Sequence, residues 1–197
     1  LGSFACAEIA RLLAKEGGLK NTRLLAGIAA YEEIGRMGSR VLARAFSPDV
    51  LIAIDVSHDF LAAPNLSNKR MTPNAMGEGF TLAVGSIVNP QLNSLYETVT
   101  AKEQIPMQRK VVGHDTGTDA MASVLARVDS AATSIGFPIR NMHTISESGH
   151  TGDVLASIYG TIALLKYLDN MHGGLGASAD DFKKGHPRLD QAPCLNN

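Results

Sequence analysis

Two adjacent carboxylates, one further carboxylate and one imidazole are the side chains of this sequence best placed to do chemistry. The apolar run at residues 24–30 leads through one tyrosine into Glu32 and Glu33, a second apolar run leads into Asp55, and His143 follows in a polar stretch. Carboxylate and imidazole groups are common ligands for zinc and similar ions. A carboxylate can also accept a proton from a reacting water. The residue types therefore predict metal binding combined with acid–base chemistry.

The apolar runs before these carboxylates predict strands of a sheet. Residues 22–31 and 49–56 are read as two buried strands, and α/β folds place ligands beyond the ends of such strands. In extended backbone adjacent side chains point to opposite faces, so Glu32 and Glu33 can take separate roles. The alternative for the Glu-Glu pair is a solvated turn, since charged residues usually lie exposed.

The other candidates also have structural alternatives. Asp55 could be a helix cap or a turn acid, and His143 could be a hydrogen-bonded histidine of the core. Asp119 is read as a cap of the helix that follows it, and Glu147 as an acid leading into a helix or supporting the site. The sequence alone leaves these alternatives open.

The remaining pattern predicts the elements that must position these groups. Turn residues, caps and apolar spacing predict helices at residues 3–16, 37–46, 90–103, 120–128 and 151–171. They predict further strands at residues 81–88, 108–113 and 131–135, with residues 136–138 as a turn. The alternation of helix and strand indicates a layered α/β sheet, which occupies residues 1–172 and is followed by a tail at residues 173–197.

Composition limits the function classes. The chain has 197 residues, 45% of them hydrophobic, which is enough for one domain with a core. The net charge of -1 argues against nucleic-acid binding driven by bulk electrostatics. No apolar run reaches the roughly 20 residues needed to span a bilayer, and no signal peptide is visible. With only two Cys in the sequence, a cytoplasmic protein without a disulfide framework and without a membrane partner is expected.

Four segments together resemble a known family. They are YEEIGRMGS (residues 31–39), IDVSH (54–58), GTDA (117–120) and PIRNMHT (138–144, with Glu147 after it). In this order they resemble the motifs of dinuclear metal aminopeptidases, most closely the glutamyl and leucyl aminopeptidase (cellulase M) family. Aspartyl aminopeptidases are a related second choice.

The resemblance implies a fold, a site and an activity. The fold is three-layered, α/β/α with a mixed central sheet, of the phosphorylase/hydrolase-like kind. Glu32 is implied as general base, and Glu33, Asp55 and His143 as metal ligands. Two divalent ions, Zn or alternatively Co or Mn, would assist removal of the N-terminal residue from a peptide substrate. Relatives form large homo-oligomers.

The resemblance also implies that part of the site lies elsewhere. The family carries a His-x-Asp ligand and a bridging Asp before the first helix, and Leu1 resembles a position just after that Asp. The sequence begins without Met and runs at once into a predicted helix. We therefore expect the N-terminal part of the domain to be missing, and an upstream segment or a second chain to carry the remaining ligands.

Two other functions remain open from the sequence. A non-catalytic relative could keep the fold as a structural subunit, which the absent upstream ligands favour. A glycosidase could use Glu32 and Asp55 as its two carboxylates, although His143 would then have no role.

Overall fold

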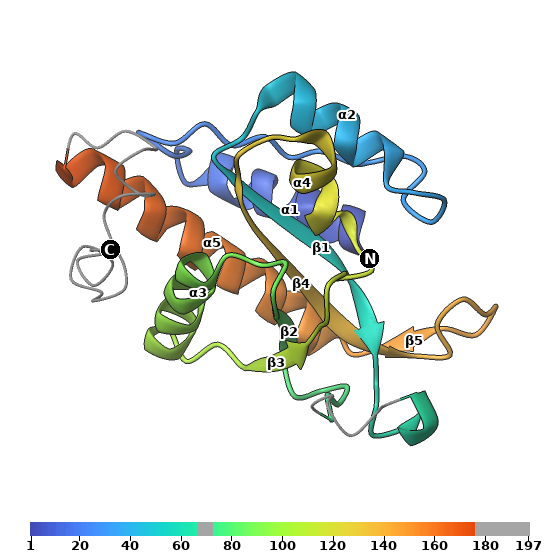
Figure 1. The fold of residues 1–197 in the computed structure, drawn as a ribbon. Helices are drawn as coiled ribbons and strands as arrows, with labels where there is room; N and C mark the ends of the chain where they lie inside the picture. The colour runs from blue at the N-terminus through green and yellow to red at the C-terminus, as the bar shows by residue number, and fades with distance from the viewer. Residues whose placement is uncertain (67–72, 176–197) are drawn as a thin grey trace, which may run out of the picture.

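Helices and strands alternate along the chain in the computed structural model, which describes residues 1–66 and 73–175 (Figure 1). The helices are α1 (Gly2–Lys15), α2 (Met37–Phe46), α3 (Pro90–Lys102), α4 (Ala122–Ala126) and α5 (Thr151–Leu175), with short 3-10 turns η1 (Pro64–Leu66) and η2 (Asp119–Met121). The strands are β1 (Val50–His58), β2 (Phe80–Val84), β3 (Met107–Val111), β4 (Ala131–Arg140) and β5 (Ser148–Gly149). All five predicted helices are present, with ends shifted by a few residues.

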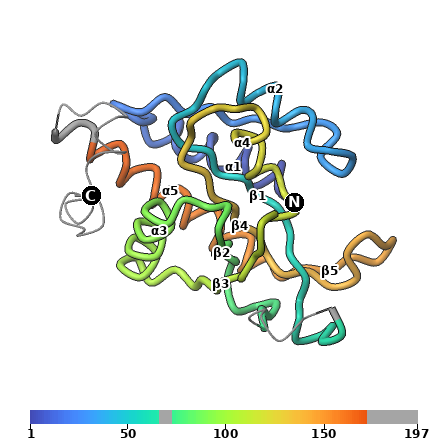
Figure 2. The backbone as a smooth tube through the Cα atoms, in the orientation of Figure 1, coloured from blue at the N-terminus to red at the C-terminus, as the bar shows by residue number. Residues whose placement is uncertain are grey.

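The strands form one mixed sheet in the order β1-β4-β2-β3, and β5 pairs with the far end of β4. The β1–β4 and β2–β3 pairs are parallel, whereas β2 and β5 run antiparallel to β4. Strand β4 is central and buried along nearly its whole length. The path of the backbone in Figure 2 shows β1 and β4 lying side by side through the middle of the molecule.

Helices cover both faces of the sheet. On one face, Leu82 and Ile135 pack with Tyr96 of α3 and Leu164 of α5. Further along the same face, Phe137 packs in a second cluster with residues from α1 and α5. On the opposite face η2 lies against β1 and β4, α4 packs on η2, and α2 packs on α4 (Figure 1). The predicted three-layer α/β/α fold with a mixed sheet is confirmed. No helix in the described parts of the chain is long and apolar enough to cross a membrane.

The predicted strand at residues 22–31 is wrong. These residues form neither a helix nor a strand, and Leu25 and Ile28 are 46% and 69% exposed. A strand needs a neighbour to bond its backbone groups, and the described residues supply no partner strand to this segment. The apolar pattern of residues 22–31 is that of a buried strand. Within the described residues, however, the packing that would bury the apolar side chains of this segment is not made.

The predicted turn at residues 136–138 is also wrong, because β4 runs straight through it. Gly136 fits because a Cβ there would lie 2.9 Å from the carbonyl oxygen of Asp55 on β1. The carbonyl of Ile139 accepts from the Asp59 amide and so faces β1. Because the backbone polar groups of successive strand residues point to opposite edges, the Pro138 nitrogen faces away from β1. On that side β2 pairs only as far as Gly136, and β5 pairs from Ile139 onward. Proline therefore sits in a gap of the ladder where no N–H is needed.

Helix α5 is buried on two sides and extends past its predicted end. Ile158 and Leu164 are 1% and 0% exposed and belong to different core clusters, whereas Leu155, predicted to be buried, is half exposed. The predicted tail at residues 173–197 begins inside this helix. Its residues 176–197 lie outside the described residues.

A carboxylate near the end of α5 fixes the segment after α1. Helix α1 ends at Gly17 and Gly18, both at positive φ, and the chain then turns back to α5. Asp169, which is 7% exposed, accepts hydrogen bonds from the backbone amides of Lys20, Asn21 and Thr22 at 2.9, 2.7 and 2.7 Å. Burial alone would raise the pKa of Asp169, but these amides together hold the pKa below its ordinary value.

We expect Asp169→Asn to lower the free energy of unfolding by about 1–3 kcal/mol at pH 7, because one acceptor is replaced by a donor facing backbone amides. The pKa of Asp169 is lowered, so its contribution is present above the unfolded-state pKa and is lost as pH falls. The gap between wild type and variant should therefore close below about pH 4. Chemical denaturation across this pH range measures it. Glu103→Gln, at an exposed glutamate, is the matched control; an equal loss there would contradict the assignment.

Candidate active site

The Glu-Glu pair lies in a tight turn before α2. The amides of Gly35 and Arg36 both donate to the Glu32 carbonyl, at 3.2 and 3.0 Å, and Gly35 has φ +126. The turn, and not the alternation of a strand, separates the two side chains. Glu32 is 26% exposed and faces the protein, whereas Glu33 is 73% exposed.

Asp55 lies within β1, three residues before the end of the strand. The sequence had predicted it at the strand end. Its Oδ1 accepts from the amide of Val56 at 2.7 Å. The helix-cap alternative is therefore wrong. Pairing of Asp55 with Gly136 in the parallel ladder sets this carboxylate beside the central strand.

His143 lies in the turn after β4, with φ +64 and an imidazole that is 66% exposed. The alternative of a core histidine is therefore wrong. Its Nδ1 lies 3.7 Å from Oε1 of Glu33, so two residues far apart in sequence meet here. Its backbone amide donates to Oε1 of Glu147 at 2.6 Å, which fixes the turn. Glu147 thus supports the loop that carries the imidazole.

A fourth carboxylate joins Glu32, Glu33 and Asp55 from the layer that holds η2 and α4. Asp119 opens η2, and its Oδ1 accepts from the Ser39 hydroxyl of α2 at 2.5 Å. The cap of η2 is Thr118, whose side chain accepts from the Ala120 amide, so the prediction of Asp119 as the cap is wrong. The Thr118 hydroxyl also donates to Ser134 of β4 at 3.0 Å, which ties this loop to the sheet.

These carboxylates repel one another. Burial is the largest cause that raises the pKa of Glu32, followed by the charges of Asp55, Asp119 and Glu33; Arg36 opposes them. Burial likewise raises the pKa of Asp55 above its ordinary value. The Val56 amide and the charge of Lys110 lower this pKa, whereas the charges of Asp119 and Glu33 raise it. The site therefore concentrates negative charge in a partly buried place.

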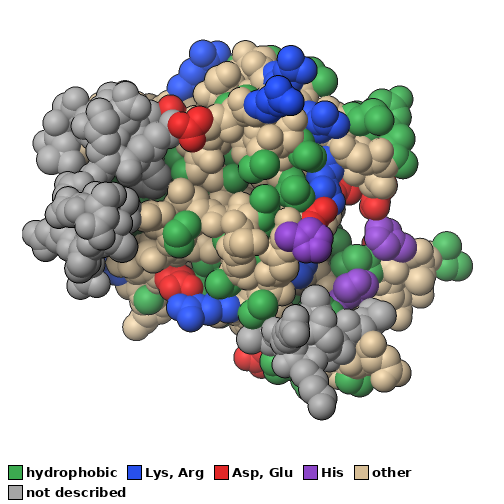
Figure 3. Space-filling model, viewed as in Figure 1, with side chains coloured by type: hydrophobic (Ala, Val, Ile, Leu, Met, Phe, Trp, Pro, Cys, Tyr) green, Lys and Arg blue, Asp and Glu red, His purple; other side chains and the backbone are tan. Residues whose placement is uncertain are grey.

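Basic groups border this cluster. Burial lowers the pKa of Lys110 on β3, and the charge of Asp55 works in the other direction. Burial also lowers the pKa of His58, at the end of β1, and the charges of Lys110 and His143 lower it further. In Figure 3 the histidines and several acidic side chains gather on one side of the visible face.

The donor set fits a divalent cation by type, since carboxylates and imidazole are the ligands such ions take in proteins. The crowding of ionised carboxylates fits as well, because a nearby cation favours their charged forms. Across residues 1–66 and 73–175, however, no three His, Cys, Asp or Glu side chains converge closely enough to hold an ion. The described residues thus bring together one pair of possible ligands, Glu33 and His143, and not the three or more that would surround an ion.

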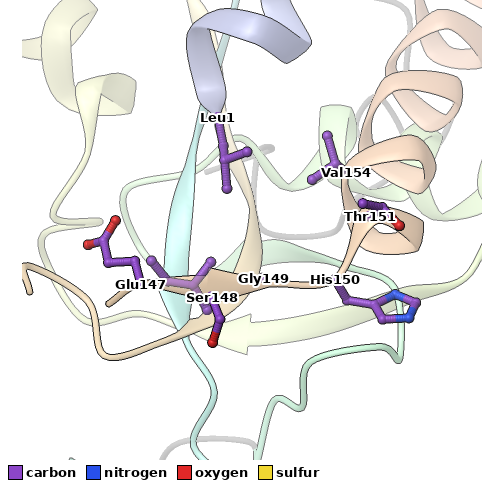
Figure 4. Close-up of a pocket in the computed structure, with 8 residues that line it drawn as sticks. Leu1, Glu147, Ser148, Gly149, His150, Thr151 and Val154 are labelled. Atoms are coloured by element: carbon purple, nitrogen blue, oxygen red, sulfur yellow. The ribbon is translucent and has the colours of Figure 1, made fainter. Parts of the chain in front are cut away.

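A hollow lies beside the loop that carries His143. Its volume is about 330 Å³, and Leu1 and Val154 lie over β5 within it (Figure 4). Its remaining lining residues are Ile139, Glu147, Ser148, Gly149, His150 and Thr151. Glu147 links it to His143 through the backbone hydrogen bond described above.

A comparison with known families decides the identity. The sequence model of the M42 glutamyl aminopeptidase family matches residues 1–159. The chain belongs to that family. The resemblance drawn from the four motifs is thereby confirmed, and the M42 assignment covers every predicted site residue.

Individual relatives of this M42 chain are longer. It is 36% identical over 143 residues to a lysyl aminopeptidase of Pyrococcus furiosus, covering 73% of this chain and 40% of that protein. Its fold is similar to a TET aminopeptidase from a marine sediment archaeon of the Thaumarchaeota, with TM-score 0.76, 24% identity and coverage of 85% and 47%. It is also similar to the TET1 peptidase of Pyrococcus horikoshii, with TM-score 0.56, 22% identity and coverage of 70% and 39%. The chain therefore spans less than half the length of these relatives.

Three residues whose charges act on Glu32 or Asp55 were not predicted as parts of a site: Asp119, Lys110 and Arg36. Asp119 lies in the GTDA segment. That motif indicated a turn, but it did not indicate where the Asp119 carboxylate would point. Lys110 lies in a predicted strand, where nothing in the sequence indicates that its ammonium reaches toward Asp55. Arg36 follows the Glu-Glu-Ile-Gly turn, and only the folded turn brings it back to Glu32.

We expect Asp119→Asn to raise the free energy of unfolding of the metal-free chain at pH 7 by up to about 1 kcal/mol, because one of the crowded like charges is removed. The amide oxygen can still accept from Ser39. The pKa values of Glu32 and Asp55 are raised, so metal-free stability is lost as pH rises through them. The gain should accordingly vanish below about pH 4, where the carboxylates are protonated.

Chemical denaturation in the presence of a chelator measures this difference. Asp49→Asn, at an exposed aspartate, is the control and should leave stability unchanged. A loss of stability in Asp119→Asn at pH 7 would contradict the repulsion described here.

Proposed function

We propose that this chain is part of a metal-dependent aminopeptidase that hydrolyses the N-terminal residue of peptides. Membership of the M42 family supports the reaction class. The observation that carries the proposal is the meeting of Glu33 with His143 at 3.7 Å, beside the half-buried Glu32. A carboxylate and an imidazole in contact, with a second carboxylate next to them, suit a metal ligand pair and a base.

In this proposal Glu33, Asp55 and His143 would be ligands of a two-ion site, with Glu33 binding one ion and His143 the other. Glu33 and Asp55 each repel the other carboxylates, and that repulsion turns into attraction once cations are present. Bound divalent ions would supply Lewis acidity toward the scissile carbonyl and the attacking water. Zn suits the carboxylate and imidazole donors, and Co or Mn are the alternatives.

Glu32 is the proposed general base. Its carboxylate is partly buried and its pKa is raised by burial and by the neighbouring acids, which strengthens it as a proton acceptor. It would take the proton of the attacking water and deliver it to the leaving amine. Because Glu32 faces inward while Glu33 faces outward, one can move a proton while the other binds a cation.

We also propose that another segment completes this site. The chain spans 40% of the length of the lysyl aminopeptidase, and in its described residues no three ligand side chains converge beyond the pair of Glu33 and His143. Residues 23–29 form neither helix nor strand, bond no neighbouring strand among the described residues and expose Leu25 and Ile28. A strand laid against them, from an upstream segment or a second chain, would bury these side chains and bring the remaining ligands.

Assembly into a homo-oligomer belongs to the same proposal. The Pyrococcus horikoshii TET1 peptidase assembles into a tetrahedron or a large octahedral shell. The exposed apolar side chains of α2 and of the segment before it, including Ile34 and Val41, give this chain surface to bury in an assembly. The alternative function is a structural subunit without turnover, which the lack of a three-ligand group in the described residues favours.

We expect Glu32→Gln to keep its bound metal and to lose turnover by about 100-fold or more, because the amide cannot accept the proton. Elemental mass spectrometry gives the metal per chain, and release of an aminoacyl fluorophore gives turnover. A chelator should abolish wild-type activity, which would also separate this enzyme from a two-carboxylate glycosidase.

Glu78→Gln, at an exposed glutamate, is the control and should match wild type in both measurements. Full turnover in Glu32→Gln would remove the base assignment. Wild-type protein that binds no Zn or Co even when these are added would support the structural subunit instead.

We expect Ile28→Lys to reduce assembly while leaving the isolated chain as stable as wild type. Ile28 is 69% exposed, so a lysine costs the isolated chain little, but it would place a charge in a buried interface. Light scattering coupled to size exclusion gives the mass in solution. Ile145→Lys, at a fully exposed isoleucine in the loop after β4, is the control. Unchanged assembly in Ile28→Lys would contradict the proposal that another segment covers residues 23–29.

A further inference from the structure

Arg36 connects three parts of the site through one side chain. Its Nη2 donates to Oδ2 of Asp115 at 3.1 Å, and its Nε lies 4.0 Å from Oε1 of Glu32. Its Nη1 lies 3.5 Å from Sδ of Met121 in η2. The side chain is only 19% exposed, so these contacts are partly shielded from water. The guanidinium therefore holds the Glu32 turn and the loop before η2 in one arrangement.

The backbone at Arg36 is also held in an uncommon conformation. Arg36 has φ +56, a region that side-chain-bearing residues seldom adopt, and it directly precedes α2. The Ser39 hydroxyl, which donates to Asp119 at 2.5 Å, also lies 3.0 Å from the Arg36 carbonyl oxygen. Such a conformation persists where the surroundings fix it, and here the fixing contacts come from the facing loop.

The facing loop is itself ordered around Asp115. Oδ1 of Asp115 accepts from the Gly117 amide at 2.8 Å, which leaves Oδ2 for the guanidinium. Each oxygen of this carboxylate thus has one donor, one inside its own loop and one from the Glu32 turn. Because both partners are fixed, the position of Arg36 is set relative to the sheet through Thr118 and Ser134.

We propose that Arg36 is a positioning residue that holds the Glu32 carboxylate in place by anchoring its turn to Asp115. The role rests on the proposed function, since Glu32 is the base only if the chain is an aminopeptidase. Arg36 acts through Glu32 and touches no substrate in this role. The planar guanidinium can face two carboxylates at fixed angles, which a lysine ammonium cannot do.

The first test compares the kinetics of Arg36→Met and Arg36→Lys with those of wild type. Displacing a reacting group by a fraction of an ångström costs turnover more than binding, so kcat should fall by roughly 10- to 100-fold in Arg36→Met with KM within about twofold. Arg36→Lys keeps the charge and should recover part of kcat. Asp115→Asn keeps Arg36 but weakens its hydrogen bond to residue 115. It should also lower kcat with KM nearly unchanged, and its loss of kcat should be smaller.

The second test needs no activity. Hydrogen exchange of the backbone amides at Gly35 and Gly38 reports the closure of the turn, because they bond the carbonyls of Glu32 and Ala30. Exchange at these amides should be at least about tenfold faster in Arg36→Met than in wild type, with the core of α5 unchanged. Arg11→Met is the control, since Arg11 pairs with Glu8 on the exposed face of α1.

The outcomes separate the two proposals. Unchanged exchange at Gly35 and Gly38 in Arg36→Met would overturn the positioning role, whatever the activity. A kcat in Arg36→Met equal to that of Arg11→Met would overturn it as well. Wild-type protein that shows no peptidase activity with the completing segment present would overturn the proposed function, while faster exchange in Arg36→Met would still establish that Arg36 holds the turn.

Discussion

The close parallel pairing of β1 with β4 is the constraint on which the candidate site depends. Asp55 lies opposite Gly136, and the backbones approach so closely that a Cβ would have no room. The same central strand delivers His143 from its end and holds the loop of Asp119 through the Ser134 hydroxyl. Three segments far apart in sequence are thus placed by one strand. A shift in the register of β4 would move all three together.

The charge of the site opposes the fold that carries it. Glu32, Asp55 and Asp119 raise one another's free energy in the ionised state, and all three lie in partly buried positions. Elsewhere the fold treats buried carboxylates differently: Asp59 is bonded to Arg140 and to two backbone amides, and Asp169 to three. The contrast between paired structural acids and crowded acids is typical of functional sites.

The sequence predicted most elements because helix periodicity and strand-like apolar runs are local properties. It failed where the outcome depends on a neighbour. Residues 22–31 read as a buried strand, but a strand forms only where another strand bonds it, and sequence does not say whether that partner is at hand. Residues 136–138 read as a turn from Gly and Pro, yet Gly136 allows the close approach to β1 and Pro138 faces a gap in the ladder. The ligand candidates were found by motif, whereas Arg36 and Lys110 enter the site only through folding.

The bond between Asp169 and the amides after α1 links the two ends of the described chain, and so it bears on the order of folding. Helix α1 packs against α5, and the backbone amides of the segment that follows it are held by a carboxylate almost 150 positions later. Central strand β4 likewise cannot join β1 until the chain between them has been made. Contacts of such long range are slow to form and must wait for the last helix during synthesis. Until α5 leaves the ribosome, the apolar side chains of α1 that pack on it stay uncovered, and at this stage the chain needs protection from aggregation.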